Sequence, residues 1–578
     1  MREITQSEAG AGRGAGLNPG VIAAAAVFAF FVLMQGIGAP FTKDAEPQSA
    51  EWIQSIVRDG YWLIPHDAYG YTDRKPPLFY WLSASVAKVS GGVVDEVRAR
   101  LVSVVAATIL AVAVLTWTVS NVGATEGWLA FILLIGTYGF ASRATEALTD
   151  MLLTLLLFAA YSAIYPLLDE MEAGTAGGSR RKIFVGAMLG LGVLTKGPVA
   201  IVLCALAAAI FLLIERRNPI VILRERWPWQ VVGIAVAIGA VWYVPAAIVG
   251  GHKIVRIIFA ENFGHFMPAR LGGTGESYRP FYYIAMRLAG GAIPMTLLII
   301  PSALAFYTDE IAVEKRRAII YQVSMPIAVL VFFSIASVKR DDYILPALPG
   351  IAILCASVFG LSVRGWAARL RDVLVWIFIL VPTVGFAFLV FFPGFALHLN
   401  LQSSDSAYYA AFREIFQRGA AGLLIAWMSL VGFEILSRVF PRRTIVGVLP
   451  NIGITFGALA LFGSLCWTAA LRPYVASLRS VKPLFPIVTI YVRGNQLCIP
   501  SGINYELSYY YGAAVPNLAN PQCADVAAGK RAYLLATARE LDEMTPEYRA
   551  RLKLPVKANL IDGSGALTLF EISGGAGK

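Results

Sequence analysis

The stretch VIAAAAVFAFFVLMQGIGAPFTKDAEPQS (residues 21–49) places an uncharged apolar run directly before two carboxylates, those of Asp44 and Glu46. The run begins at Pro19 and is long enough for one membrane crossing, because about 20 apolar residues in a helix cover about 30 Å of hydrocarbon. Carboxylates are costly beside hydrocarbon and are usually functional or paired there. The stretch therefore predicts a membrane-embedded fold with a polar site at one end of its first helix.

Similar apolar runs recur along the 578-residue chain, in which 57% of the residues are hydrophobic and only 15% are charged. A soluble enzyme does not have this composition, so we expect a polytopic α-helical membrane protein. The first run lacks a compelling cleavage pattern and is expected to be a retained anchor. Thirteen crossings, give or take one or two, are predicted near residues 20–37, 101–119, 126–142, 147–167, 183–195, 198–214, 228–250, 285–306, 319–337, 342–362, 373–393, 420–437 and 445–471.

The net charge of +11 is carried by Lys and Arg clusters in short loops. These clusters occupy every second loop, as the positive-inside rule predicts for cytoplasmic loops. The clusters lie at residues 180–182, 216–226, 315–317, 364–371 and 438–443. The charge therefore indicates topology rather than a nucleic-acid partner, and a cytoplasmic N-terminus with thirteen crossings places the C-terminus outside, in the periplasm of a bacterium.

Residues 183–214 test this topology, because 32 residues are too long for one span and short for two. Both flanks are basic, and the sequence TKGP at residues 195–198 interrupts the run. We expect two short crossings with Lys196 between them on the outer side.

Three segments face outward in this topology. Loop 38–98 is rich in Trp and Tyr and is expected to form short helices at the membrane interface. Loop 251–284 is the second, and both belong to a transmembrane domain of residues 1–471. Residues 472–578 are predicted to form a periplasmic α/β domain, with strands at LFPIVTIYV, RAYLLAT and LTLFEI and helices at ELSYYY and RELDEMTPEYRARL.

The five cysteines divide between the spans and the tail. Cys204, Cys355 and Cys466 lie in apolar runs and are expected to be packing residues. Cys498 and Cys523 both lie in the tail, on the oxidising side of the membrane, so we expect a disulfide between them; the alternative is two buried free thiols.

Ionisable residues that fit poorly with a structural role all map to the same outer side. They are Asp44, Glu46, Asp73, Arg74, Lys75, Arg143, Glu146, Asp150, Lys196, His265, Arg270, Lys339, Arg340, Asp341 and Asp342, joined by Tyr343. Carboxylates can orient or deprotonate an acceptor, while Lys, Arg and Tyr can hold a phosphate that leaves. Both signs on one face suggest a single cavity for the transfer of a group from a phosphate-linked lipid.

The motifs DAE, RKPPLFYW, TEALTDMLL, LTKGP, FAENFGHFMPARL and KRDDYILPALPG resemble those of membrane glycosyltransferases with the C-type fold, which use polyprenyl-phosphate sugars. The resemblance covers about the first 350 residues. It is greatest to the branch that transfers 4-amino-4-deoxy-L-arabinose from undecaprenyl phosphate to lipid A. Two positions depart from the pattern: Ala45 separates Asp44 from Glu46, and Arg74 stands where a glutamate commonly precedes the lysine.

The resemblance implies a catalytic role for Asp44 and a second functional acid at Asp150. It also implies that Lys75, Arg270 and Tyr343 face the carrier phosphate. Because a lipid A phosphate is already ionised, Asp44 could bind the sugar's amino group or orient the acceptor instead of acting as a base.

The residues themselves add further candidates, each with a structural alternative. Glu46 is predicted to share the catalytic role, against a solvated loop end. Five further residues are predicted to bind substrate, namely Lys196, Lys339, Arg143, Glu146 and Glu506. The structural alternatives are a charge at a helix end for Lys196, a charge neutralised by its neighbours for Lys339 and a surface charge for Glu506. No cofactor is expected, and a divalent cation held by His265 is the alternative, although the four histidines are not spaced as a metal triad.

The predicted function is an inverting, monomeric, lipid-to-lipid glycosyltransferase of the bacterial inner membrane. It would move aminoarabinose from undecaprenyl phosphate to lipid A at the periplasmic face, among membrane lipids, and give resistance to polymyxin. A related transferase with a protein or polysaccharide acceptor is the first alternative. A transporter or flippase is the second, but it would need charges on both sides of a midplane site.

Overall fold

The first helix of the computed structural model, α1 (Pro19–Leu33), starts where the sequence provides a cap. The Asn18 side chain accepts the N–H of Gly20, and Pro19 fixes the first helical φ without losing a hydrogen bond. Helix α1 packs along α4 (Glu96–Asn121), whose cap is the Asp95 carboxylate accepting the Arg98 N–H. The structure describes residues 17–42, 45–72, 75–174, 178–263, 279–308, 311–360, 365–391, 428, 451–520, 523, 531–550, 552–562 and 565–572.

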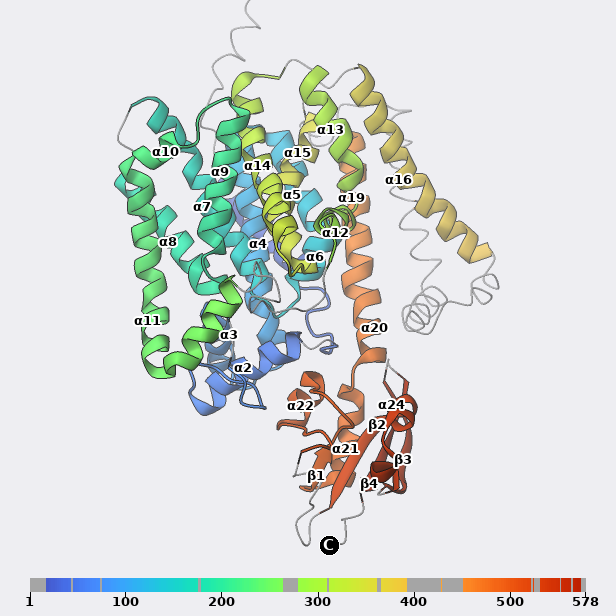
Figure 1. Cartoon of the computed structure of the whole chain (residues 1–578). Helices are drawn as coiled ribbons and strands as arrows, with labels where there is room; N and C mark the ends of the chain where they lie inside the picture. Colours follow the sequence, from blue (N-terminus) through green and yellow to red (C-terminus); the bar gives the residue numbers. More distant parts are fainter. Residues whose placement is uncertain are drawn as a thin grey trace, which may run out of the picture.

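Helix α4 lies at the centre of a helical bundle, where it also contacts α3, α5 and α7 (Figure 1). The other bundle elements are α5 (Ala124–Ile135), α6 (Tyr138–Ala144), α7 (Asp150–Glu172), α8 (Ser179–Lys196), α9 (Val199–Ile214), α10 (Val221–Arg224), α11 (Arg226–Phe263), α12 (Tyr283–Gly291), α13 (Thr296–Thr308), α14 (Val313–Ile335), η3 (Asp341–Ala347), α15 (Leu348–Gly360), α16 (Gly365–Phe391), α19 (Asn451–Leu465), η4 (Cys466–Leu471) and α20 (Arg472–Arg479). The prediction of a mainly helical membrane protein is confirmed.

Six described helices are long and apolar enough to cross a membrane, or up to eight if each of two bent pairs is one span. The count of thirteen stays a prediction, and the window 420–437 lies outside the described residues apart from Met428. Two predicted single spans, 126–142 and 285–306, are wrong in shape: α5 and α6 meet at 63°, and α12 and α13 at 100°. Pro294, which donates no backbone hydrogen bond, lies in the second break, and hydropathy alone does not show such a bend.

The predicted break at TKGP is confirmed, since α8 ends at Lys196 and α9 begins at Val199. Gly197 adopts a φ of 85°, which favours glycine, and Pro198 precedes the new helix. Helix α11, by contrast, runs past the expected end at residue 250. It breaks at Gly251 and continues to Phe263, so the predicted loop 251–284 is partly helical.

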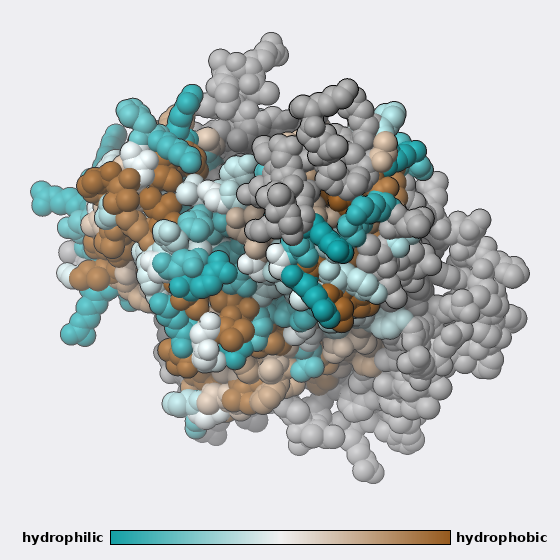
Figure 2. All heavy atoms as spheres, turned by 90° about the horizontal axis from the view of Figure 1, so that it is seen from below, coloured by the Kyte–Doolittle hydropathy of each residue, from teal (hydrophilic) through white to brown (hydrophobic). Residues whose placement is uncertain are grey.

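The predicted short helices of loop 38–98 are α2 (Ala45–Asp59) and α3 (Leu78–Val89). Seen from the end of the molecule that carries the C-terminal sheet, hydrophilic side chains cover the middle of the face (Figure 2). A hydrophobic patch lies at its left edge, on the side of α11. Two side chains of α11, Ile248 and Val249, are 76% and 70% exposed. Apolar side chains exposed to this extent fit contact with lipid.

The C-terminal part lies below the bundle in Figure 1, and α20 connects the two. Its sheet has the order β1-β2-β4-β3, with β1 (Gln496–Cys498) parallel to β2 (Ala532–Thr537) and the other pairs antiparallel. The remaining elements are η5 (Lys482–Leu484), α21 (Phe485–Val492), α22 (Tyr505–Tyr511), α24 (Ala538–Glu543), α25 (Pro546–Ala550), β3 (Leu552–Asp562) and β4 (Gly565–Ile572). The disulfide Cys498–Cys523 forms, as predicted.

Two secondary-structure predictions in the tail are wrong. LFPIVTIYV is helix α21 rather than a strand, because Pro486 starts a helix and Phe485, Val488 and Val492 share one buried face. RELDEMTPEYRARL is two short helices rather than one, since Pro546 begins α25. Both errors involve prolines at helix starts.

Helices α2 and α22 meet at the buried carboxylate of Glu51. Glu51 accepts hydrogen bonds from the Ser508 hydroxyl and, at 3.0 Å, from the Ala68 N–H. Burial raises the pKa of Glu51 to about 7, although these hydrogen bonds act in the opposite direction. The contact between the tail and the bundle therefore contains a group that binds a proton more tightly when folded.

We predict that the contact between α2 and α22 weakens as the pH rises. The folded pKa lies above the ordinary value of 4.5, so the contribution of Glu51 to stability is complete below about 4.5 and is lost as the pH rises through about 7. Amide hydrogen exchange of residues 505–511, corrected for intrinsic rates, should be faster at about pH 8 than at about pH 5. Glu51→Gln should remove this dependence, whereas Glu543→Gln, at an exposed ion pair, should retain it; equal protection of the wild type at both pH values would contradict the prediction.

Candidate active site

The start of α2 is fixed by a buried ion pair between Glu46 and Arg100 of α4. The Arg100 Nε and Nη2 atoms lie 2.8 and 3.0 Å from the two oxygens of Glu46, and the Ala147 N–H donates to the same carboxylate at 2.9 Å. The Arg100 side chain is 1% exposed, and it also donates to the carbonyls of Ile37, at 2.8 Å, and Ala39. Burial alone would raise the pKa of Glu46, but the ion pair outweighs it and the pKa stays below the ordinary value. Arg100 thus holds the chain on both sides of residues 43–44.

The tail supports the same segment from the other side. The hydroxyl of Tyr510 in α22 accepts the Phe41 N–H at 2.9 Å and donates to Glu96 at 2.7 Å. Lys482 donates to the same Glu96 oxygen at 2.6 Å. The Phe41 ring lies between Tyr509, 5.1 Å away between centroids, and the Arg100 guanidinium at 4.8 Å. The C-terminal part is therefore attached directly to the segment that precedes Asp44.

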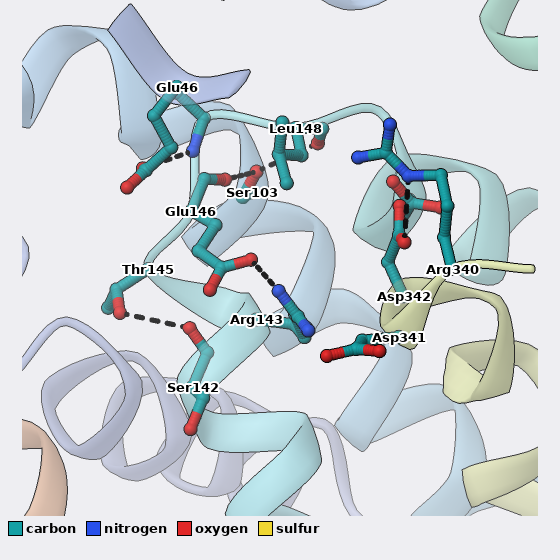
Figure 3. Close-up of polar contacts among 12 residues, drawn as sticks. Glu46, Ser103, Ser142, Arg143, Thr145, Glu146, Leu148, Arg340, Asp341 and Asp342 are labelled. Carbon is teal, nitrogen blue, oxygen red and sulfur yellow. Dashed lines mark hydrogen bonds and ion pairs between the residues drawn. The ribbon is translucent and has the colours of Figure 1, made fainter. Parts of the chain in front are cut away.

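A second arginine, Arg472 at the start of α20, extends this charge cluster towards α6. Its Nη2 atom lies 3.8 Å from Glu46 and 3.6 Å from Glu146, and its Nη1 atom donates to the Ser142 carbonyl at 2.8 Å. Glu146 pairs in turn with Arg143 at 2.5 Å (Figure 3). Charges of alternating sign therefore continue from α2 to the segment between α6 and α7.

The third cluster surrounds Lys196 at the end of α8. Its ammonium contacts the Asp150 carboxylate, lies 3.9 Å from Asp342 and sits 4.8 Å from the centre of the Tyr343 ring. Arg340 pairs with Asp342 at 3.2 Å (Figure 3). Within the described part of the chain, the second carboxylate oxygen of Asp150 and that of Asp342 are buried without a hydrogen-bond partner. Elements far apart in the sequence, α7, α8 and η3, thus place opposite charges in one site.

A cavity of about 290 Å³ opens beside this cluster. Lys75, Lys196 and Tyr343 supply part of its polar lining, together with Glu261 and Asn262 of α11. Its other walls are apolar and come mainly from α9 and α14, with Leu153, Pro198, Val199, Val202, Phe332, Phe333, Ala336 and Val338. The arrangement can hold an amphiphile whose anionic group meets two ammonium groups while its chain contacts hydrocarbon.

The structure brings six of the predicted site residues into this region. Lys75, Lys196 and Tyr343 line the cavity, Asp150 lies behind it, and Arg143 and Glu146 belong to the adjoining charge cluster. Asp44, Arg270 and His265 lie outside the described residues. Their roles, and those of the residues described here, stay predictions.

Three other predicted site residues do not line the cavity, and their roles also stay predictions. Glu46 is paired with Arg100, which fixes the start of α2. Lys339 donates to the carbonyls of Ala336, at 2.6 Å, and Arg279, at 3.1 Å, beyond the end of α14, and it does not line the cavity either. Glu506 accepts hydrogen bonds from Ser480 and the Val481 N–H inside the tail.

Sequence reasoning missed Arg100, Arg472 and Glu261. Arg100 and Arg472 stand immediately beside apolar runs, where an arginine is expected to mark the end of a span. The available signal was that the predicted topology puts each of them on the outer side, where the positive-inside rule predicts few such residues. Among the described residues, no group of three His, Cys, Asp or Glu side chains is placed to hold a metal ion.

The chain is similar to known proteins in sequence and in fold. Residues 74–244 match the family of dolichyl-phosphate-mannose-protein mannosyltransferases. The undecaprenyl phosphate-alpha-4-amino-4-deoxy-L-arabinose arabinosyl transferases of Aeromonas hydrophila and Enterobacter sp. are 26% and 28% identical to it, over 74% and 54% of each chain, so the second match spans about half of that relative.

The crystal structure of ArnT from Cupriavidus metallidurans bound to undecaprenyl phosphate superposes with a TM-score of 0.72 at 16% identity, covering 95% of this chain and 97% of that one. A likeness at this identity establishes the fold. Together with the sequence matches, it confirms the predicted resemblance to glycosyltransferases of the C-type fold.

We predict that breaking the pair Glu46–Arg100 destabilises the protein strongly. Removal of one partner leaves a buried charge uncompensated, which costs about 3–5 kcal/mol of unfolding free energy. Arg100→Met and Glu46→Gln should each show this loss in denaturant unfolding in detergent, and the double variant should lose less than the sum.

Arg98→Met is the matched control, because Arg98 lies on the same helix in a half-exposed pair with Asp95 and should cost less than about 1 kcal/mol. Additive losses in the double variant would show that the two side chains do not act together.

Proposed function

We propose that the protein is a lipid-dependent glycosyltransferase that moves 4-amino-4-deoxy-L-arabinose from undecaprenyl phosphate to a phosphate of lipid A. The observation that carries this proposal is the cavity beside Lys196, which is lined by the ammonium groups of Lys75 and Lys196 and, for the most part, by apolar side chains. A polyprenyl phosphate has the matching chemistry, with a charged phosphate on a long hydrocarbon chain. The names of the relatives, and the carrier lipid in the structure with the same fold, support this choice of donor.

The reaction needs a leaving group that is stabilised and an acceptor that is oriented. An oxygen of the acceptor phosphate attacks the anomeric carbon, and the bond from that carbon to the carrier phosphate oxygen breaks with inversion. The carrier phosphate takes up the electron pair, and Lys75 and Lys196 stabilise its charge. Asp150 and Asp342 hold the ammonium of Lys196 in place, because its contacts with them fix its position beside the cavity.

Asp44 completes the proposed site, since the segments on both sides of it are anchored by Arg100 and Tyr510. Its role is to orient the acceptor or to bind the sugar's amino group, because an ionised phosphate needs no base. We propose a monomer that works without a metal ion, and chelation by EDTA, which should leave the rate unchanged, tests the second point.

The site is proposed to face the periplasm of a bacterial inner membrane, with the tail on the same side. Modification of lipid A there reduces the negative charge of the surface, which would protect against polymyxin. A transferase with a protein or polysaccharide acceptor is the remaining alternative, because the contacts around Lys196 do not select the acceptor. A transporter fits less well, since the described charges around Asp150, Lys196 and Asp342 gather at the ends of α7, α8 and η3.

Mass spectrometry of lipid A tests the proposal as a whole. A strain that lacks the protein should lose the aminoarabinose adduct, and a plasmid copy should restore it. Unchanged lipid A in the deletion strain would remove the proposed acceptor. Transfer by the purified protein from undecaprenyl-phosphate aminoarabinose to lipid A in proteoliposomes is the direct assay.

We predict that Lys75→Met and Lys196→Met each weaken binding of undecaprenyl phosphate about tenfold, the loss of one charge-assisted hydrogen bond. Methionine keeps the apolar stem, so the packing of the cavity wall is largely retained. The measurement is a binding titration in nanodiscs. Lys88→Met is the control, because Lys88 contacts the Trp62 ring and does not line the cavity; equal affinities for all four proteins would contradict the assignment of the phosphate end.

We predict that Asp44→Asn lowers transfer by at least about a hundredfold while binding of undecaprenyl phosphate stays within about twofold of the wild type. The change removes one charge and keeps the shape, so it separates chemistry from folding. Asp59→Asn, at an exposed ion pair on the neighbouring helix, should retain full transfer. Normal transfer by Asp44→Asn would show that this carboxylate is dispensable.

A further inference from the structure

A second cluster of charge lies beside η3, outside the cavity. We propose that α12 and the residues directly before it carry the docking site for the acceptor phosphate, with Arg279 and Arg287 as its ligands. This inference rests on the proposed function and names where the second substrate binds. Neither arginine lines the cavity assigned to the carrier lipid.

The two clusters diverge at adjacent residues of η3. Asp342 is buried and pairs with Arg340 and Lys196, as described above. Asp341 faces α12 instead, where it contacts Arg287 at 2.5 Å, Arg279 at 3.9 Å and the hydroxyl of Tyr283. Because a 3₁₀ helix turns by about 120° per residue, consecutive side chains point in different directions. The outer cluster therefore lies one residue away from the inner one.

The outer cluster has a surplus of positive charge and is open to solvent or lipid. Two guanidinium groups meet one carboxylate, and the side chains of Arg279, Arg287 and Asp341 are 43%, 46% and 37% exposed. The Arg279 guanidinium lies 4.4 Å from the centre of the Tyr283 ring, which orients it, and its backbone carbonyl accepts from Lys339. Guanidinium groups in this setting are suited to a phosphate, which they bind through paired N–H donors.

Exposed apolar side chains lie next to the two arginines in the sequence. Phe281, Met286 and Tyr282 are 74%, 63% and 50% exposed beside Arg279 and Arg287. An acceptor that carries phosphate on an acylated sugar presents both chemistries, whereas a soluble phosphate would leave these side chains uncovered. The patch therefore favours an anionic glycolipid such as lipid A.

Helix α12 is also rigidly joined to the proposed reaction site. Ile284 and Leu288 are buried on its inner face, and a Cβ on Gly291 would lie 2.3 Å from the side chain of Ile344 in η3. A Cβ on Gly139 of α6 would lie 2.5 Å from the Gly291 carbonyl, and the Tyr138 N–H donates to the Ile293 carbonyl at 3.0 Å. A phosphate bound on α12 would thus be held at a fixed distance from η3 and from Arg143.

Transfer between two lipids requires the two phosphates to approach one sugar from opposite sides, because inversion demands attack opposite the leaving group. The cavity on the α9 and α14 side of η3 receives the donor in the proposed function. The α12 cluster lies outside that cavity, at the adjacent residue of η3, and its positive charge attracts the second anion. Both the positive charge of this cluster and its position beside η3 therefore support its assignment to the acceptor phosphate.

The test is the steady-state kinetics of the full-length protein in proteoliposomes, with the two substrates varied separately. The double variant Arg279→Gln/Arg287→Gln should raise the KM for lipid A about tenfold and leave the KM for undecaprenyl-phosphate aminoarabinose within about twofold. Arg279→Lys/Arg287→Lys, which keeps the charge, should recover at least half of that loss. Arg58→Gln, at an exposed pair with Asp59 on α2, is the matched control and should change neither KM.

A second arm distinguishes a lipid A phosphate from any phospholipid headgroup. Phosphatidylglycerol added to neutral vesicles should compete poorly with lipid A, so the KM for lipid A should stay within about twofold; strong competition would overturn the assignment to lipid A. An unchanged KM for lipid A in the Gln double variant, or an equal rise in both KM values, would also overturn the inference. If the wild-type protein transferred no sugar, the proposed function itself would be contradicted. This outcome differs from a failure of the inference, because no variant would then have activity to compare.

Discussion

The ion pair between Glu46 and Arg100 is the constraint on which the end of the bundle next to the C-terminal sheet depends. One guanidinium binds the first turn of α2 through Glu46 and the end of the first apolar run through the carbonyls of Ile37 and Ala39. The same carboxylate accepts the N–H of Ala147, between α6 and α7. Four segments therefore meet at two side chains. A buried ion pair of this kind is weak evidence for stability, since apolar residues of equal volume often do as well. Its value here is positional, because no apolar contact would fix three backbone groups and a helix start at once.

From this pair the buried charges continue with alternating sign to the cavity. Arg472 links Glu46 to Glu146, Glu146 pairs with Arg143, and Asp342, Asp150 and Lys196 form the far end. Each charge has a partner of opposite sign within about 4 Å, which is how a membrane protein can bury many charges at moderate cost. The two oxygens without hydrogen-bond partners, on Asp150 and Asp342, lie at the end next to Lys196 and the cavity.

Much of this arrangement could be predicted from the sequence, for identifiable reasons. Hydropathy predicted the helices, and the sequence TKGP predicted the break at Lys196, because glycine and proline interrupt a helix in any context. The direction of a side chain is different, since it depends on neighbours distant in sequence. Lys339 stands three residues before Asp342 in one motif but turns to the backbone beyond α14, and Glu506 caps a segment of its own domain. Arg100 was overlooked for the opposite reason: an arginine beside an apolar run is explained equally well by the end of a span, and only the fold shows that it points inward.

The short helix η3 shows how one turn can serve two substrates. Asp341 faces α12, while Asp342 and Tyr343 face Lys196, and the Tyr343 ring stacks on Phe333 in the wall of the cavity at 4.3 Å between centroids. In an α-helix, the side chains of residues 341 and 342 would point about 100° apart and the helix axis would continue into the site. The 3₁₀ turn instead ends at Ala347 and passes directly into α15. A shift of η3 would therefore move both clusters together. Because Gly291 of α12 packs against the side chain of Ile344 in η3, the packing of that one turn influences the distance between the two proposed phosphate sites.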